Sequence, residues 1–395
     1  KKCPPVVERS EEACPRTPMT RTQRALLLTL ASLFASASAA EVHAFFYLWY
    51  GTPDVDGAWR HWDHEVLPHW NERQREQYPH SIRHNPPEQL HSPFYPLRGA
   101  YSSRNETALA EQMEEAFSSG IDALIVSWWG RPDHANTSDT QGVNTDSAIP
   151  PLLAAAEAHG RIRIGFHLEP YPGRCVESVR RDLEYLHEKY GASPALLRTK
   201  NGGKVMYVYD SYHIPAEDWA SLLMPRGRHS VRNTELDGSF VALALSLSDE
   251  ANLASAGFDQ AYSYFASDAV SAASRPIAWP KLVETYNALG MAFIPSIGAG
   301  YDDSRIRPWN KDATRSREGG ARYERAWAAA MRSGAKTVAI TSYNEWGEGT
   351  QIEPARTDPP PGHQNYGAGG AYLYLDITRK AAEKFKTIAH GSQEL

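Results

Sequence analysis

Residues 337–353 read TVAITSYNEWGEGTQIE, and the rest of the chain is organised around them. A β-branched, apolar run that predicts a buried strand passes without a polar spacer into an amide, a tryptophan and the carboxylates Glu345 and Glu348. In α/β proteins, functional side chains follow the carboxyl ends of parallel strands. The stretch therefore predicts the last strand of the fold and, directly after it, a candidate general base and general acid.

Seven further runs of the same kind precede this strand and alternate with segments of helical period. The predicted strands are 43–49, 122–128, 163–168, 205–209, 239–245, 260–265, 291–297 and 336–342. The predicted helices are 106–119, 148–159, 177–190, 216–223, 280–289, 320–332 and 371–388. Continuous apolar strands that alternate with helices indicate a parallel sheet covered by helices. Eight such units predict one (β/α)8 TIM barrel, and the first strand lacks the glycine-rich turn of a dinucleotide-binding fold.

The composition fits a globular domain and disfavours nucleic acid as a partner. The chain has 395 residues, is 42% hydrophobic and carries a formal net charge of −6, without a lysine- or arginine-rich run. It contains 11 tryptophans and 20 tyrosines. These aromatic residues predict either a large aromatic core or a sugar-binding cleft, and composition alone favours the core.

The N-terminal segment is read separately from the fold. Residues 19–24 are basic, 25–34 are apolar and 35–40 are small, which is the pattern of a secretory signal peptide. The apolar part is shorter than the about 20 residues of a membrane helix, so a signal anchor is the alternative. We therefore divide the chain into an unassigned leader, 1–18, a signal segment, 19–40, and one barrel domain, 41–395. Membrane attachment is expected only if the signal segment stays uncleaved.

The connection after the first strand, residues 50–104, is long and rich in Pro, His and Trp. A loop of this length is commonly functional, and its aromatic content predicts an ordered segment over the barrel mouth. The spacing of His61, His64 and His69 allows a metal site, but no cysteine or second matched cluster follows. Packing or substrate contact is the preferred interpretation, and we expect no metal and no cofactor.

The predicted strand ends combine aromatic rings with a few carboxylates. Sugar rings stack on aromatic faces, and a glycosidic oxygen needs a proton as it leaves, so this combination points to carbohydrate chemistry. Besides Glu345 and Glu348, the candidate substrate contacts are Trp49, Tyr50, Trp128, Glu169, Tyr212, Tyr264, Asn344 and Trp346. Asp210 can equally cap the next helix. For Glu169 we prefer a ligand-binding role over that of a buried acid with a structural partner.

Several long motifs carry a family resemblance. They are FYLWYG at 46–51, WDHEVLPHW at 62–70, YVYDSY at 207–212, IRPWN at 306–310 and NEWGEGTQIE at 344–353. In this order they resemble the endo-α-1,2-mannosidases of glycoside hydrolase family 99. The resemblance covers residues 43–388.

The resemblance implies a metal-independent, retaining endo-glycosidase. Such an enzyme cleaves an internal α-1,2-mannosidic bond and releases a disaccharide from glucosylated high-mannose N-glycans or from α-mannan. The implied mechanism passes through a 1,2-anhydro sugar, with Glu345 as the base at the 2-hydroxyl and Glu348 as the acid at the leaving oxygen. Tyr50, Glu169, Tyr212 and Tyr264 would surround the reacting mannose.

Two alternatives and one departure accompany this interpretation. A related barrel glycosidase could use direct displacement, with Glu169 or Asp210 paired to Glu348, and a non-catalytic glycan-binding protein could use the aromatic mouth alone. Gly347 stands where the family pattern leads us to expect a bulkier residue, often His. We expect a monomer in the secretory pathway, either in the Golgi lumen or secreted.

Overall fold

The computed structural model describes residues 40–134 and 137–391. The predicted leader and nearly all of the signal segment lie outside this part. The strands are β1 Glu41–Phe46, β2 Ala123–Trp128, β3 Arg163–Leu168, β4 Lys204–Val208, β5 Gly238–Leu243, β6 Gln260–Tyr262, β7 Ala292–Ile294, β8 Ser296–Gly298 and β9 Thr337–Thr341. The helices are α2 Pro53–Asp56, α3 Glu106–Ser118, α4 Ile149–His159, α5 Val176–Tyr190, α6 Ala216–Leu223, α7 Glu250–Ser255, α8 Trp279–Ala288, α9 Ala321–Ser333 and α10 Leu373–Gly391.

The strands form one parallel sheet in the order β7-β6-β5-β4-β3-β2-β1-β9-β8. The two ends of this order, β7 and β8, are separated in the chain only by Pro295. Because β7 pairs with β6 and β8 pairs with β9, the sheet closes on itself through this residue. The predicted TIM barrel is confirmed, with the predicted seventh strand divided in two.

Pro295 explains this division. Proline has no backbone N–H, so it cannot donate to the ladder within a continuous strand. Its carbonyl still accepts the N–H of Ala339, at 3.0 Å, across the point where the barrel closes.

The barrel interior is filled by aromatic and imidazole rings. The ring centroid of Phe45, on β1, lies 5.7 Å from that of Tyr207 and 5.5 Å from that of Tyr262. The Tyr207 hydroxyl lies 2.8 Å from His43 Nδ1, and the Tyr262 hydroxyl lies 2.6 Å from His167 Nε2. The polar tips of these buried rings thus satisfy one another, as a buried polar group requires.

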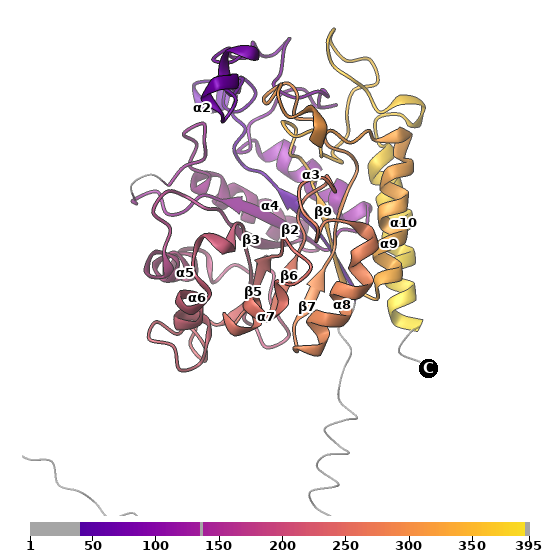
Figure 1. Cartoon of the computed structure of the whole chain (residues 1–395). Helices are drawn as coiled ribbons and strands as arrows, with labels where there is room; N and C mark the ends of the chain where they lie inside the picture. Colours follow the sequence, from indigo (N-terminus) through magenta and orange to yellow (C-terminus); the bar gives the residue numbers. More distant parts are fainter. Residues whose placement is uncertain (1–39, 135–136, 392–395) are drawn as a thin grey trace, which may run out of the picture. The chain divides into compact units, whose positions relative to one another are not determined.

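Helix α5 shows why the helices cover the outside of the sheet. It buries Val176, Val179, Leu183, Leu186 and Tyr190. These residues recur every three to four positions and form one apolar stripe, each burial being worth about 1.5–3 kcal/mol. In Figure 1 the helices surround the strands. Two short helices, α2 with four residues and α7 with six, were missing from the predicted set.

The long loop after β1 is ordered, as its composition predicted. Its anchor is Trp62, which is fully buried, stacks on Tyr50 with centroids 4.2 Å apart, and donates from Nε1 to the Tyr101 carbonyl at 2.7 Å. The Leu67 N–H donates to the Ile306 carbonyl at 2.8 Å, so the loop also contacts the segment after β8. Figure 1 shows the loop, with α2, at the top of the barrel.

Within residues 40–134 and 137–391, no helix is both long and apolar enough to cross a membrane.

Candidate active site

The carboxyl ends of the strands open into a pocket. Five of the predicted site residues line it: Trp49, Glu169, Tyr264, Glu345 and Glu348. They come from the ends of β1, β3, β6 and β9, which the sequence separates widely. Barrel closure therefore brings together the residues that the strand-end argument had selected.

The two acids lie on a tight turn that follows β9. The Glu345 N–H donates to Ser342 Oγ at 2.7 Å, and the Ser342 N–H donates to the Thr350 carbonyl at 3.1 Å. The Glu348 N–H donates to the Glu345 carboxylate. Gly349 adopts φ +59°, and a Cβ there would lie 2.9 Å from the Asp302 carbonyl oxygen, so the turn requires glycine. The local sequence thus fixes both carboxyl groups on one side of the turn.

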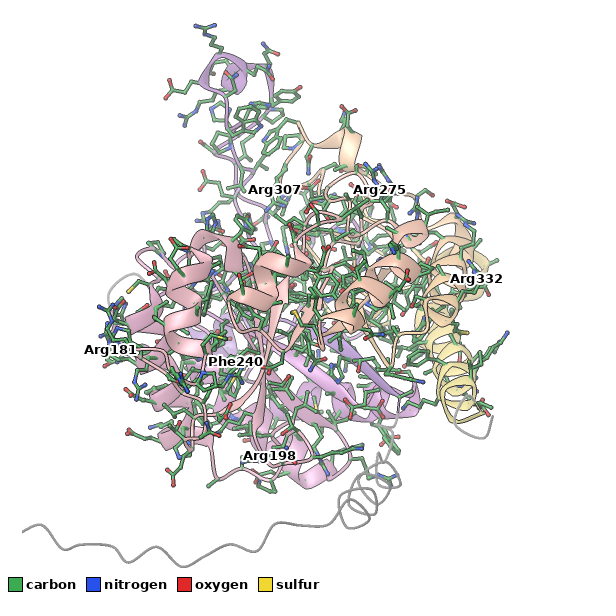
Figure 2. The ribbon with its side chains drawn as sticks, turned by 60° about the horizontal axis from the view of Figure 1, so that its bottom comes forward. Arg181, Arg198, Phe240, Arg275, Arg307 and Arg332 are labelled. Atoms are coloured by element: carbon green, nitrogen blue, oxygen red, sulfur yellow. The ribbon has the colours of Figure 1, made fainter. Side chains whose placement is uncertain are left out.

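A cation stands beside the second acid. Arg307 Nη1 lies 3.3 Å from Glu348 Oε1 and 3.1 Å from Asp303 Oδ2. Asp303 is fully buried and also accepts from Tyr301 Oη at 3.0 Å and from Asn310 Nδ2 at 2.9 Å. Figure 2 shows Arg307 below the projecting loop that follows β1. This network holds the guanidinium against Glu348 in a fixed position.

Burial and mutual repulsion set the charges of the acid pair. Burial raises the pKa of Glu345 well above its usual range, and the Glu348 carboxylate raises it further. Burial also raises the pKa of Glu348, whereas Arg307 lowers it. Like charges this close do not both ionise easily, so the pair retains a proton into a higher pH range than isolated glutamates do. Because Arg307 stabilises the ionised form of Glu348, the proton that the pair retains resides mainly on Glu345.

Glu169, after β3, also lines the pocket and is held in place by its neighbours. Ser127 Oγ donates to Glu169 Oε1 at 2.8 Å, and the Glu169 N–H donates to the Trp128 carbonyl at 3.0 Å. His167 Nδ1 lies 3.1 Å from the same carboxylate oxygen. One carboxylate oxygen is thus fixed by the barrel, and the group as a whole faces the pocket.

Stacked rings form a third wall. The Trp49 ring stacks on Tyr47, with centroids 4.5 Å apart, and on His61, with centroids 4.3 Å apart and planes within 5° of parallel. His61 Nε2 pairs with Asp139, from the loop after β2. The hydroxyls of Tyr47 and Tyr264 share a hydrogen bond. Flat apolar faces edged by polar groups are what a sugar ring needs.

Three predicted substrate contacts support the catalytic turn from behind and lie outside the pocket. The Tyr50 hydroxyl donates to the Asn344 carbonyl at 2.8 Å and accepts the Trp346 N–H at 3.1 Å. The Asn344 side chain accepts from the Tyr47 N–H at 2.7 Å and donates to its carbonyl at 3.0 Å. Trp346 Nε1 donates to Glu353 at 2.8 Å. These side chains are buried and position Glu345 rather than face the cavity.

The remaining two predicted contacts, Trp128 and Tyr212, are also outside the pocket. Trp128 points away from the barrel axis, where its Nε1 donates to Asp146 Oδ1 at 2.9 Å and its ring stacks near Tyr185 of α5. The next residue, Trp129, faces the pocket instead, because successive side chains point to opposite faces. Tyr212 follows β4 on a short helical turn, and its side chain is 54% exposed.

Sequence reasoning missed several residues of the pocket, chiefly on the loops. They are Tyr47, His61, His64, His91, Trp129, Asp139, Thr140, His167, Pro170, Tyr209, Ile306 and Arg307. His61 and His64 had been weighed as metal ligands together with His69, which instead stacks on Trp70 away from the pocket. No group of three side chains able to hold a metal ion occurs in the described part of the chain. Arg307 belongs to the motif at 306–310, which carried the family resemblance, but the sequence did not indicate that it contacts Glu348.

A closed (β/α)8 barrel with paired, buried carboxyl groups and stacked aromatic rings at its mouth supplies the two acids and the flat ring faces that glycoside hydrolysis uses. The sequence model of glycosyl hydrolase family 99 matches residues 38–387, and the chain belongs to this family. It is therefore a glycoside hydrolase, and its substrate contains a glycosidic bond.

Relatives with assigned names support the same family. The glycoprotein endo-alpha-1,2-mannosidase-like protein of Mus musculus is 41% identical over 352 residues, which cover 88% of this chain and 76% of the relative. The glycoprotein endo-alpha-1,2-mannosidase of Rattus norvegicus is 40% identical over 351 residues, 87% of this chain and 74% of the relative. The GH99 endo-alpha-mannosidase from Bacteroides thetaiotaomicron superposes with a TM-score of 0.80 at 34% identity, covering 88% of this chain and 98% of that one.

Proposed function

We propose that this chain is a retaining, endo-acting α-1,2-mannosidase that releases a disaccharide from glucosylated high-mannose N-glycans or from α-mannan. The observation that carries the proposal is that Glu345 and Glu348 lie on one tight turn and face one pocket, which a third carboxylate and stacked rings also line. The names of the relatives supply the linkage and the sugar.

In the proposed mechanism each acid transfers protons at a different oxygen of the substrate. Glu345 removes the proton of the mannose 2-hydroxyl, and this oxygen attacks C1 as the glycosidic bond breaks. Glu348 protonates the departing oxygen, which leaves a 1,2-anhydro sugar and a shortened glycan. Glu348 then takes a proton from water, the water oxygen attacks C1, and Glu345 returns its proton to O2. Two inversions at C1 give net retention.

In the proposed mechanism Glu345 is ionised and Glu348 is protonated, and contacts with the substrate favour this arrangement. The 2-hydroxyl donates a hydrogen bond to Glu345, which favours the ionised form of this group. The glycosidic oxygen can only accept a hydrogen bond, which favours protonated Glu348. We therefore expect the shared proton to move from Glu345 to Glu348 when the substrate binds.

An unsatisfied donor in the pocket supports a hydroxyl-rich ligand. Trp129 Nε1 is buried, lines the pocket and has no hydrogen-bond partner among the described residues. Buried polar groups in folded proteins nearly always have a partner. A sugar hydroxyl would satisfy this donor while the ring stacks on the sugar face.

Direct displacement by a carboxylate remains the rival route, and the structure narrows its candidates. Glu169 lines the pocket, whereas Asp210 lies outside it, with its backbone carbonyl bound by Arg174 Nη2 at 2.7 Å. A non-catalytic glycan-binding protein would need the aromatic walls but not the buried acid pair. Burying carboxyl groups is costly, so the pair supports catalysis over binding alone.

For the cellular setting we propose the secretory pathway, either the Golgi lumen or the extracellular space, with a monomeric enzyme. This rests on the signal-like segment at 19–40 and on the glycoprotein substrates that the names of the mammalian relatives indicate.

Two variants and one substrate analogue test the mechanism. Glu345→Gln and Glu348→Gln should each lower kcat by about 10²- to 10⁴-fold on a mannose glycan, the usual worth of a general acid or base. Wild-type turnover in either variant removes the role assigned to that residue. A substrate with fluorine in place of the 2-hydroxyl should be neither cleaved nor attached to the protein, because the proposed nucleophile is gone. A covalent adduct on Glu169, detected by intact mass and peptide mapping, would establish direct displacement instead.

A further inference from the structure

His91 is a buried imidazole in the pocket wall with both ring nitrogens unsatisfied. The residue is 1% exposed and lines the same pocket as Glu345 and Glu348. Neither Nδ1 nor Nε2 has a hydrogen-bond partner within the described chain. Because leaving a buried polar group unpaired costs free energy, its position at a ligand pocket indicates that the ligand supplies the partner.

Gly347, between the two acids, makes room for this ring. A Cβ on Gly347 would lie 2.8 Å from His91 Cδ2, 2.9 Å from His91 Nε2 and 3.3 Å from Glu345 Oε1. The φ angle of Gly347 is not in the left-handed region, so the backbone itself does not demand glycine. Space is the remaining reason: any side chain at position 347 would push the imidazole away from Glu345.

The surroundings keep the ring neutral. Burial lowers the pKa of His91 well below its usual value, and His64 and His61 lower it further. The His64 ring lies nearly parallel to it, with planes 16° apart and centroids separated by 6.0 Å. A neutral imidazole has one donor and one acceptor, which matches a hydroxyl group, since a hydroxyl also donates and accepts.

We propose that His91 binds a hydroxyl group of the glycan and holds the sugar in register with Glu345, and that Gly347 is present in this chain to admit the ring. This inference rests on the proposed function, because it takes a glycan as the ligand. In this chain the pocket wall beside Glu345 is formed by His91, from the loop after β1. The family pattern led us to expect a side chain at position 347 there instead.

The first test removes the hydrogen bonds and keeps the shape. His91→Phe retains a ring but neither donor nor acceptor, and should lower kcat/KM by roughly 10- to 100-fold, as loss of one buried hydrogen bond to a ligand does. His91→Gln keeps a donor and an acceptor and should recover most of this loss. His80→Phe, on the same loop but outside the pocket, is the matched control and should keep wild-type kinetics. Equal kcat/KM in His91→Phe and wild type would overturn the proposal.

A second variant tests the role of Gly347. Gly347→Ala should lower kcat/KM when His91 is present, because the new methyl displaces the ring. In a His91→Ala background the space is open, so the same change should cost much less. Equal losses in the two backgrounds would show that Gly347 acts independently of His91 and would overturn that part of the proposal.

Binding measurements separate failure of this inference from failure of the proposed function. Calorimetric titration of a mannan oligosaccharide into Glu348→Gln, with and without His91→Phe, needs no turnover. Weaker binding in the double variant supports the role of His91 even if the wild type cleaves no mannose glycan. Equal affinity, or no binding to either protein, contradicts the role of His91, whereas wild-type disaccharide release alongside equal affinity leaves the proposed function standing.

Discussion

Replacing Arg307 by Met should move the pH profile of the enzyme toward alkaline pH. The guanidinium lies 3.3 Å from Glu348 Oε1, and both side chains are less than a third exposed, at 30% and 24%. Removing this positive charge removes the main influence that lowers the pKa of Glu348, while buried Asp303 continues to raise it. The pKa of Glu348 therefore rises in the variant.

The magnitude follows from the contact. An opposite charge within about 4–6 Å shifts a carboxyl pKa by about 1–3 units. Arg307 also contacts Asp303, at 3.1 Å, so Glu348 does not receive its full effect. The proposed acid must be protonated to act, and the enzyme loses activity as pH rises through its pKa. A higher pKa thus moves the alkaline limb of the pH profile toward higher pH.

The assay is kcat/KM as a function of pH, which reports the ionisations of the free enzyme. Because the two carboxyl groups titrate as a pair, both limbs are macroscopic values. Arg307 also lowers the pKa of Glu345, so the acid limb should move up as well, by a smaller amount. Arg325→Met, on the exposed face of α9, is the control and should leave both limbs in place. An alkaline limb that stays or moves down in Arg307→Met would refute the role of Arg307 in lowering the pKa values of the acid pair.

Two further predictions concern residues outside the pocket. Glu353→Gln should lower the free energy of unfolding in urea by about 3 kcal/mol, because the fully buried carboxylate accepts from Arg98, Tyr101, Gln112 and Trp346 and an amide cannot accept from all four; a loss below about 1 kcal/mol would contradict this. Tyr212→Phe should change kcat/KM by less than about twofold, since the side chain is exposed and outside the pocket; a tenfold loss would show that it reaches the substrate.

Most of the fold was predictable because each buried strand is a short apolar run in the sequence and each long helix shows apolar residues every three to four positions. The division of the seventh strand at Pro295 was foreseeable from proline chemistry but was hidden inside an apolar run. Helix α7 was missed because its six residues are too few to show a period. The long loop was predicted to be ordered over the mouth, and Trp62 shows how it is held there.

The site was predictable where it follows strand ends and not where loops supply it. Glu345, Glu348 and Glu169 follow strands directly, so barrel closure places them together. A strand buried on both faces gives no alternation, so the sequence could not tell Trp128, which faces α5, from Trp129, which faces the pocket.

The loop residues of the pocket depend on packing between distant segments. His91, Asp139 and Arg307 lie on three different loops and meet only in the folded chain. No local pattern in the sequence marks which of the polar residues on such loops will turn inward. The sequence offered one indirect indication: Gly347 stands where a larger residue was expected. In the structure His91 lies next to this position.

Cleavage of an internal mannosidic bond by the acid pair is tested by mass analysis of the products from a glucosylated high-mannose N-glycan and from α-mannan, with Glu348→Gln as the inactive reference. We predict release of a disaccharide, glucosyl-mannose from the first or mannosyl-mannose from the second, and none from the variant. Release of single sugars, or no release from either substrate by the wild-type protein, would contradict the account.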